Sequence, residues 1–145
     1  MATTQTTMPE TVTVDGKHYE LAKISTIAKA QLPNLRFADG QIQLLKNRKA
    51  LAETARSAYA QALTQHLPVK TAPANRKKDV ITIDDIRYKL EDFSAEGKAQ
   101  LLNIQFAERE LERLNNELAI TQTARTRYAT VLAEELKGAK AIKTQ

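Results

Sequence analysis

Cysteine and tryptophan are missing from this 145-residue chain, and histidine, glycine and proline are scarce, with two, four and four residues. Without cysteine, disulfides and thiolate metal sites are excluded, which suits a reducing compartment. The glycines stand singly, so no glycine-rich loop is available to cradle a phosphate. The two histidines, His18 and His66, are too few for a convergent metal or acid–base cluster. We therefore expect no enzyme activity, no cofactor and no metal.

Long apolar runs are missing as well. No stretch approaches the ~18 consecutive apolar residues of a membrane span. The first ten residues have neither the basic segment nor the apolar core of a secretory signal. We expect a cytoplasmic protein with no membrane partner.

The chain does contain an internal repeat. Laying residues 12–67 over residues 81–136 without a gap, at an offset of 81 − 12 = 69, gives 22 identities in 56 aligned positions. The echo is clearest between Thr54–Ala60 and Thr123–Ala129. Unrelated sequences would share only a few positions, so we interpret the two stretches as copy 1 and copy 2 of a tandem duplication. A copy of this size has a marginal core alone, so each is expected to need the other.

The net charge of +5 is unevenly divided between the copies. Copy 1 has eight Lys and Arg against four Asp and Glu, a net charge of +4, whereas copy 2 has seven against eleven, a net charge of −4. Patches of opposite charge steer docking. The copies are therefore expected to attract each other like the halves of a fused pseudo-heterodimer.

Each copy begins with a pattern typical of a β-hairpin. In copy 1, alternating residues from Val12 and from His18 flank Asp15-Gly16, and Asp-Gly between alternating runs predicts a two-residue turn. Copy 2 repeats the plan around Asp84-Asp85, where turn chemistry explains the two acidic residues better than a cation site does. The hairpins are expected either to pair into one four-stranded sheet or to lie separately against helices.

A long helix is predicted after each hairpin. Ser25 and Ser94 are suitable N-caps, and apolar residues follow at heptad spacing, so that the copy 2 helix would run to Leu136. Such length favours a bend or break, and Pro33 and Gly40 place either a kink or a division into a short and a long helix near residues 33–40. The predicted fold is α+β and mostly helical: duplicated hairpins with long or kinked helices, packed as a pseudo-two-fold helical bundle or coiled coil.

The regions outside the copies are polar. Residues 1–11 are expected to form a disordered leader, residues 68–80 a basic flexible linker and residues 137–145 a basic tail. The linker cluster Arg76, Lys77 and Lys78 is the candidate nucleic-acid contact, although three charges in a linker more often serve solubility.

The repeated Thr-Ala-Arg-x-x-Tyr-Ala segments hold the candidate interface residues Arg56, Tyr59, Arg125 and Tyr128. The heptad frame places both arginines on the inner seam, where each needs a carboxylate, a carbonyl or water. A role in fixing the register between the copies is favoured over a ligand or partner site. In that role, changing either arginine to alanine is expected to cost about 1–3 kcal/mol of stability.

The repeated motifs also carry a resemblance. Val-x-Val-Asp-Gly-x-x-Tyr-x-Leu, then Ala-Lys-Ala-Gln-Leu and Thr-Ala-Arg-x-x-Tyr-Ala, resemble a small uncharacterised domain of bacteria and their phages that usually occurs as a single copy. Copy 2 departs from the pattern at Asp85, which replaces the turn glycine. The resemblance implies an accessory protein of a phage or bacterium, and it supplies no catalytic residues.

Two functions remain open from the sequence. The first is a non-enzymatic interaction protein, such as a phage accessory factor that binds a host protein, with self-association into a dimer of tandem chains. The alternative is a nucleic-acid-associated protein that uses the basic linker and tail. The identity of the protein partner does not follow from the sequence.

Overall fold

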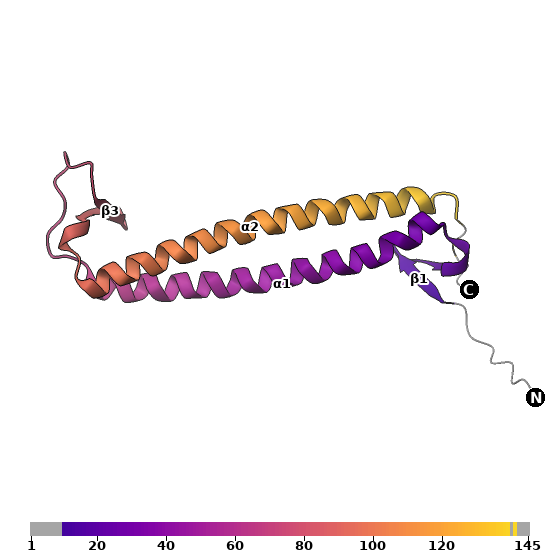
Figure 1. Ribbon diagram of the computed structural model, residues 1–145, viewed down its shortest axis with the longest axis horizontal. Coiled ribbons are helices and arrows are strands. Elements are labelled where there is room, and N and C mark those ends of the chain that lie inside the picture. Colours follow the sequence, from indigo (N-terminus) through magenta and orange to yellow (C-terminus); the bar gives the residue numbers. More distant parts are fainter. Residues whose placement is uncertain (1–9, 140, 142–145) are drawn as a thin grey trace, which may run out of the picture. The chain divides into compact units, whose positions relative to one another are not determined.

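The computed structural model describes residues 10–139 and 141, and it is mostly helical with two β-hairpins (Figure 1). The strands are β1 (Thr11–Val14), β2 (Lys17–Glu20), β3 (Val80–Ile83) and β4 (Ile86–Lys89), and the long helices are α1 (Thr26–Leu63) and α2 (Ala95–Leu136). Short 3-10 turns follow at Leu21–Lys23, Thr64–His66 and Leu90–Asp92. Met1–Pro9, most of the predicted leader, lie outside the described residues, as do Lys140 and Ile142–Gln145 of the tail.

The chain divides into two compact units, and each combines part of α1 with part of α2. Unit 1 is formed by the residues up to Leu44 and from Leu118 onward, and unit 2 by Leu45–Glu117. Unit 1 thus combines the β1–β2 hairpin and the start of α1 with the end of α2. Unit 2 combines the β3–β4 hairpin and the start of α2 with the end of α1.

Both hairpins form as the sequence predicts. Asp15 and Gly16 have φ of 50° and 75°, and Asp84 and Asp85 have φ of 49° and 65°. Left-handed backbone at both central residues is typical of the type I′ turn that joins two antiparallel strands. In the part of the chain that the structure describes, the strands form two separate two-stranded sheets. Of the two alternatives, the single four-stranded sheet is therefore wrong, and separate hairpins lying against helices are confirmed.

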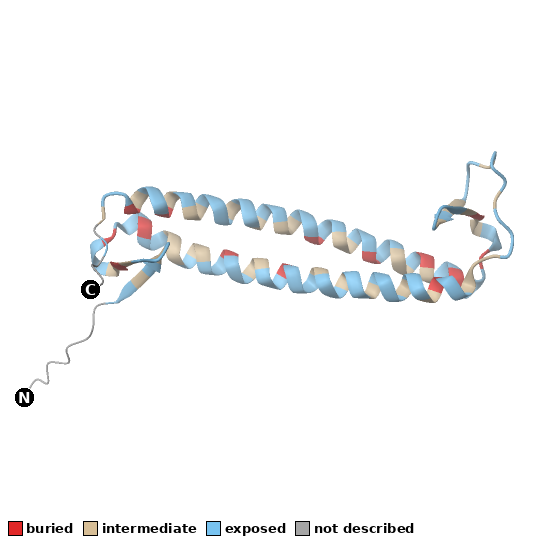
Figure 2. Cartoon of the chain, turned by 180° about the vertical axis from the view of Figure 1, so that it is seen from behind, coloured by how far each residue is buried: buried red, intermediate tan, exposed pale blue. Residues whose placement is uncertain are grey.

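Each unit has its own small hydrophobic core at the hairpin. In unit 1 the buried residues are Tyr19, Ile24, Ala28, Leu132 and Leu136. In unit 2 they are Leu63, Tyr88, Phe93 and Leu101. The inward face of each hairpin therefore packs on the start of one long helix and on the end of the other. In Figure 2 buried residues lie where each hairpin meets the helices, and others lie at intervals along the two long helices.

The predicted N-caps begin both helices. Ser25 Oγ accepts a hydrogen bond from the backbone N–H of Ala28 at 3.0 Å, and Ser94 Oγ accepts one from Gly97 at 3.1 Å. These bonds satisfy donors that the first turn of a helix leaves without an intrahelical acceptor.

Of the two alternatives near residues 33–40, the division into two helices is wrong, because α1 continues through Pro33. The kink stays a prediction. Proline removes one backbone hydrogen bond and crowds the carbonyl four residues earlier. Its neighbours Leu32 and Leu35 pack against the core of unit 1 and hold the helix on both sides of the proline. Side chains on the predicted seam are buried further along, including Ala38, Leu45, Ala107 and Leu114.

The segment between α1 and β3 makes specific contacts within unit 2. The Ala72 N–H donates to the Arg87 carbonyl of β4 at 2.7 Å. The Arg87 guanidinium donates in return to the carbonyls of Pro73, Ala74 and Arg76. The flexibility expected of residues 68–80 stays a prediction beside these bonds.

None of the helices in residues 10–139 and 141 is both long enough and apolar enough to cross a membrane.

Candidate functional site

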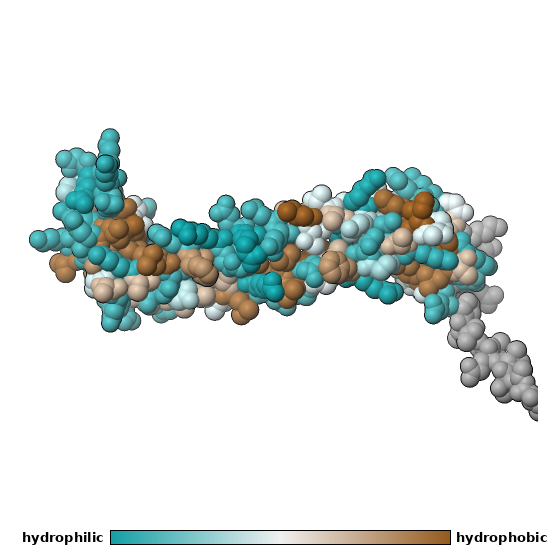
Figure 3. All heavy atoms as spheres, in the orientation of Figure 1, coloured by the Kyte–Doolittle hydropathy of each residue, from teal (hydrophilic) through white to brown (hydrophobic). Residues whose placement is uncertain are grey.

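Each unit has a groove beside its hairpin. Groove 1, in unit 1, has a volume of about 260 Å³, and groove 2, in unit 2, has a volume of about 460 Å³. Both are bordered by the first strand of the hairpin, by the start of the helix that follows it, and by the end of the other long helix. Figure 3 shows hydrophobic residues gathered beside the hairpin of unit 2.

The two grooves are built from equivalent positions of the repeat. Every residue that lines groove 1 has a counterpart in groove 2 at a distance of 69 positions. The pairs are Thr13 and Thr82, Val14 and Ile83, Asp15 and Asp84, Leu32 and Leu101, Leu35 and Ile104, Arg125 and Arg56, Ala129 and Ala60, Leu132 and Leu63, and Ala133 and Thr64. Groove 2 is larger, and Gln61, Ile81, Gln105 and Glu108 also line it.

The floor of each groove is apolar. In groove 2 it consists of the buried Leu63 and Leu101 with the half-buried Ile104. In groove 1 the buried Leu132 lies with the half-buried Leu32 and Leu35. Each floor is thus the solvent-facing margin of a hairpin core, and an apolar side chain placed there would gain free energy by leaving water.

An arginine–carboxylate pair stands at each groove. The Arg56 guanidinium donates from Nη2 and Nε to Glu108 Oε1 at 3.0 and 3.2 Å. Arg125 donates from Nε to Asp39 Oδ1. Asp39 and Glu108 are themselves 69 positions apart, so the ion pair recurs with the groove. Each arginine thus lies beside a carboxylate.

The arginine side chains are nevertheless about half exposed, 51% for Arg56 and 44% for Arg125. Tyr59 and Tyr128, three residues after each arginine, are half-buried. The structure thus brings each candidate arginine to a groove beside a carboxylate, and the register role of the four residues stays a prediction.

The backbone of β3 forms one wall of groove 2. Ile81, Thr82, Ile83 and Asp84 all line the groove, although successive side chains of a strand point to opposite faces. Four consecutive lining residues therefore place the edge of the strand beside the groove. In the described part of the chain β4 is the partner strand of β3, and the opposite edge of β3 has no partner strand.

The sequence did not predict the grooves. The alternating pattern predicted the hairpin strands that border the grooves. It did not predict which helix end each strand would contact. One signal was available: Asp39 and Glu108 are both acidic at equivalent positions, as are Asp15 and Asp84 at the turns.

The candidate nucleic-acid residues lie apart from the lining of both grooves. Arg76 donates from Nη1 to Glu91 Oε1 at 3.4 Å and from Nε to the Lys78 carbonyl at 3.2 Å. Lys77 and Lys78 are exposed. The arginine of the cluster is thus engaged in fixing the linker of unit 2.

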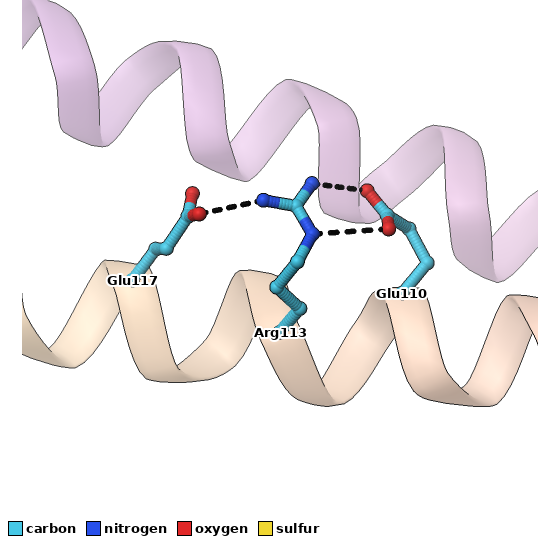
Figure 4. Close-up of polar contacts among 3 residues, drawn as sticks. All are labelled: Glu110, Arg113 and Glu117. Atoms are coloured by element: carbon cyan, nitrogen blue, oxygen red, sulfur yellow. Dashed lines mark hydrogen bonds and ion pairs between the residues drawn. The ribbon is translucent and has the colours of Figure 1, made fainter.

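A second charged region of unit 2 lies along α2 (Figure 4). Arg113 donates to both oxygens of Glu110 and, from Nη1, to Glu117 Oε1 at 2.5 Å. The hydrogen bond from Arg113 holds the pKa of the Glu110 carboxyl below its ordinary value, with the positive charges of Arg113 and Arg48 contributing further. The same carboxylates raise the pKa of Arg113.

A shallow cleft of about 630 Å³ lies near these residues in unit 2. Its lining includes Glu53, Glu108 and Glu112 together with Asn116. Across residues 10–139 and 141, no three His, Cys, Asp or Glu side chains come together in a way that could hold a metal ion.

The groups that meet at groove 1 and groove 2 are apolar side chains, a strand edge and one arginine–carboxylate pair. Such a set can bury apolar side chains and bond to a main chain. The resemblance of the repeated motifs to a small domain of bacteria and phages stays a prediction, since no family model, curated protein or solved structure matches the chain.

Proposed function

We propose that this chain is a non-enzymatic interaction protein that binds a protein partner through groove 1 and groove 2. The observation that carries the proposal is the pairwise equivalence of the lining residues, from strand to floor to arginine. Both grooves also present an apolar floor at the surface. A concave apolar site with a few placed polar groups is the usual form of a binding site.

Two equivalent sites on one chain favour a partner with two matching segments, or two partner chains. Binding at one site raises the effective concentration for the second, so the combined affinity exceeds that of either groove alone. Modest grooves of this size would therefore be effective as a pair.

The biological setting proposed is that of the resembling domain: an accessory protein of a phage or bacterium, with a host protein as the partner. We propose further that the chain arose by tandem duplication and that its helices pack as a coiled coil. Equivalent N-caps, turns, ion pairs and grooves at a constant offset of 69 positions support the duplication.

The test is affinity capture from bacterial lysate, with mass-spectrometric comparison of a groove variant and a matched control. Ala60→Glu with Ala129→Glu places a carboxylate in each groove at an equivalent pair of helix positions. Ala50→Glu with Ala119→Glu makes the same change at another equivalent pair, exposed and outside the lining of both grooves.

We expect the groove variant to capture at least about tenfold less partner, because the change falls at a central contact of the interface. The control should capture as much partner as the unchanged chain. Capture should persist as salt rises, whereas contacts to nucleic-acid phosphates weaken steeply with salt. Proteins captured equally by both variants, or lost on moderate salt, would contradict the proposal.

A further inference from the structure

We infer that groove 1 and groove 2 receive extended peptide segments, each adding as a strand to the open edge of β1 or β3. The inference rests on the proposed function and names its binding mode and partner class. The partner segment carries apolar residues at alternate positions, with a lysine or arginine at the end that lies beside the hairpin turn.

The register of the hairpins identifies which backbone groups face the open edge. The two-residue turn joins Ile83 to Ile86, and such a flanking pair exchanges hydrogen bonds in a type I′ hairpin. Alternation along the ladder then turns the N–H and C=O groups of Thr82 outward from β3. The same register in β1 turns those of Thr13 outward.

Two observed bonds fix this alternation independently. Arg87, the partner of Thr82, accepts from the Ala72 N–H on the outer side of β4, so the pair Thr82–Arg87 faces outward. The Leu90 N–H donates to the Asp79 carbonyl at 2.8 Å. Asp79 and Leu90, the next pair after Val80 and Lys89, are therefore hydrogen-bonded to each other. Both bonds agree with an outward Thr82.

The second hairpin already bonds to another segment of the chain, but on its other edge. The linker adds its Ala72 bond to β4, and Arg87 fixes it through three carbonyls. This arrangement covers part of the edge of β4. The edge of β3, which borders groove 2, stays uncovered in the described part of the chain. An exposed strand edge beside an apolar groove is the surface used in β-strand addition.

The groove walls select the side chains of the added strand. Every second side chain of such a strand would point to the floor formed by Leu63, Leu101 and Ile104, which favours apolar residues at alternate positions. A helix would fill the floor but leave the edge groups of β3 without partners, because its own backbone groups are bonded internally.

Charge complementarity favours a basic residue at one end. The lining of groove 2 contains Arg56 against Asp84 and Glu108, a net charge of 1 − 2 = −1. Since Arg56 already binds Glu108, the turn carboxylate of Asp84 is the charge available to a ligand. In groove 1 the bond between Arg125 and Asp39 likewise leaves Asp15.

The test is selection of phage-displayed random peptides on the whole chain, followed by affinity measurements on the enriched peptides. We expect alternating apolar residues with a flanking lysine or arginine. In an added strand, every second amide N–H points toward the edge of β1 or β3, and the others point away from it. N-methylation of the amides that point toward the edge should weaken binding by about tenfold or more, and N-methylation of the other set should weaken it much less.

Protein variants give a second readout. Thr13→Pro with Thr82→Pro removes one outward N–H group from each strand edge, at positions where proline is tolerated, and Thr13→Ala with Thr82→Ala keeps it. The proline pair should lose peptide binding and the alanine pair should keep it. If circular dichroism shows the proline pair unfolded, the N-methylated peptides decide alone.

Enriched peptides that lose binding with Ala60→Glu and Ala129→Glu but are insensitive to N-methylation would overturn strand addition and leave the proposed function standing. The same holds if no peptide is enriched while lysate capture still depends on those alanines. If neither peptides nor captured proteins depend on the grooves, both the inference and the proposed function fail.

Discussion

Arg56 and Arg125 occupy equivalent places, yet their exposure limits what each contributes to stability. Each binds one carboxylate while about half of its side chain remains in water. Exposed ion pairs are worth roughly 0–1 kcal/mol. We therefore expect Arg56→Ala or Arg125→Ala to lower the free energy of unfolding by less than about 1 kcal/mol, below the 1–3 kcal/mol expected of an arginine that loses a buried partner.

Urea denaturation measures this difference, and the double variant Arg56→Ala with Glu108→Ala isolates the coupling between the two side chains. A loss above about 2 kcal/mol for the single variant would show that the arginine holds the core of its unit rather than a surface pair.

The Glu110 carboxyl is a sharper probe of local electrostatics. Its pKa is lowered in the folded chain, chiefly by the hydrogen bond from Arg113. A carboxyl with a lowered folded pKa stabilises the protein above its unfolded pKa, and this contribution disappears as the pH falls through the folded value. Arg113→Met should therefore raise the pKa of Glu110 toward the ordinary glutamate value.

An NMR titration of the Glu110 side-chain carbon measures this shift. Arg109→Met removes a neighbouring positive charge that is not among the causes of the lowered pKa, and it serves as the control. An unchanged Glu110 pKa in Arg113→Met would contradict the assignment.

At the scale of residues, the sequence did not predict which carboxylate each arginine would bind. The heptad frame singled out both arginines and required a polar partner for each. Naming Asp39 and Glu108 needed the knowledge of which turns of α1 and α2 face each other, and no local pattern encodes that.

At the scale of elements, Pro33 is the position where local sequence and structure conflict. It lies inside α1, where it lacks the N–H that would bond to the Lys29 carbonyl. Pro33→Ala should restore this bond and the better helix propensity of alanine, raising the free energy of unfolding by about 1–3 kcal/mol.

Thermal and urea unfolding give the measurement. Leu102, the exposed counterpart of Pro33 in α2, supplies the control, and Leu102→Ala should change stability by no more than about 0.5 kcal/mol. If Pro33→Ala lowered the stability instead, the proline would have to serve the packing of unit 1.

The hairpins, the serine caps and the end of α2 at Leu136 were predictable because each depends on neighbouring residues. The division of the helix near residues 33–40, one of two predicted alternatives, was wrong because the local cost of proline was weighed without the packing of Leu32 and Leu35. The pairing of each hairpin with a helix end from the other copy is a long-range property, and it became visible only in the folded units.

At the scale of the whole molecule, each unit contains an ion pair between the two copies, and in unit 2 the pair follows the net charges of the copies. In unit 2, Arg56 of copy 1 binds Glu108 of copy 2, and Nε2 of His66 in copy 1 lies 3.3 Å from Oε2 of Glu96 in copy 2. In unit 1 the direction reverses, since Arg125 of copy 2 binds Asp39 of copy 1. The sequence thus predicted attraction between the copies but not its distribution over two separate cores.

Self-association is the last expectation at this scale, and exposed aromatic residues support it. Phe37 in unit 1 and Phe106 in unit 2 are 69% and 70% exposed and occupy equivalent positions of the repeat. Each exposed phenyl ring would gain free energy by leaving water, and the repeat presents the same ring in both units. We predict that the chain forms a dimer of tandem chains, burying these phenyl rings against a second copy.

Sedimentation equilibrium at micromolar concentration should give about twice the chain mass of 16.2 kDa. Phe37→Lys with Phe106→Lys should shift the protein to the monomer, because a charge buried in an apolar interface is costly. Ala50→Lys with Ala119→Lys adds the same charges at exposed equivalent positions and should leave the dimer intact. A mass of 16.2 kDa at every concentration and salt would refute the dimer and assign the exposed phenyl rings to a foreign partner.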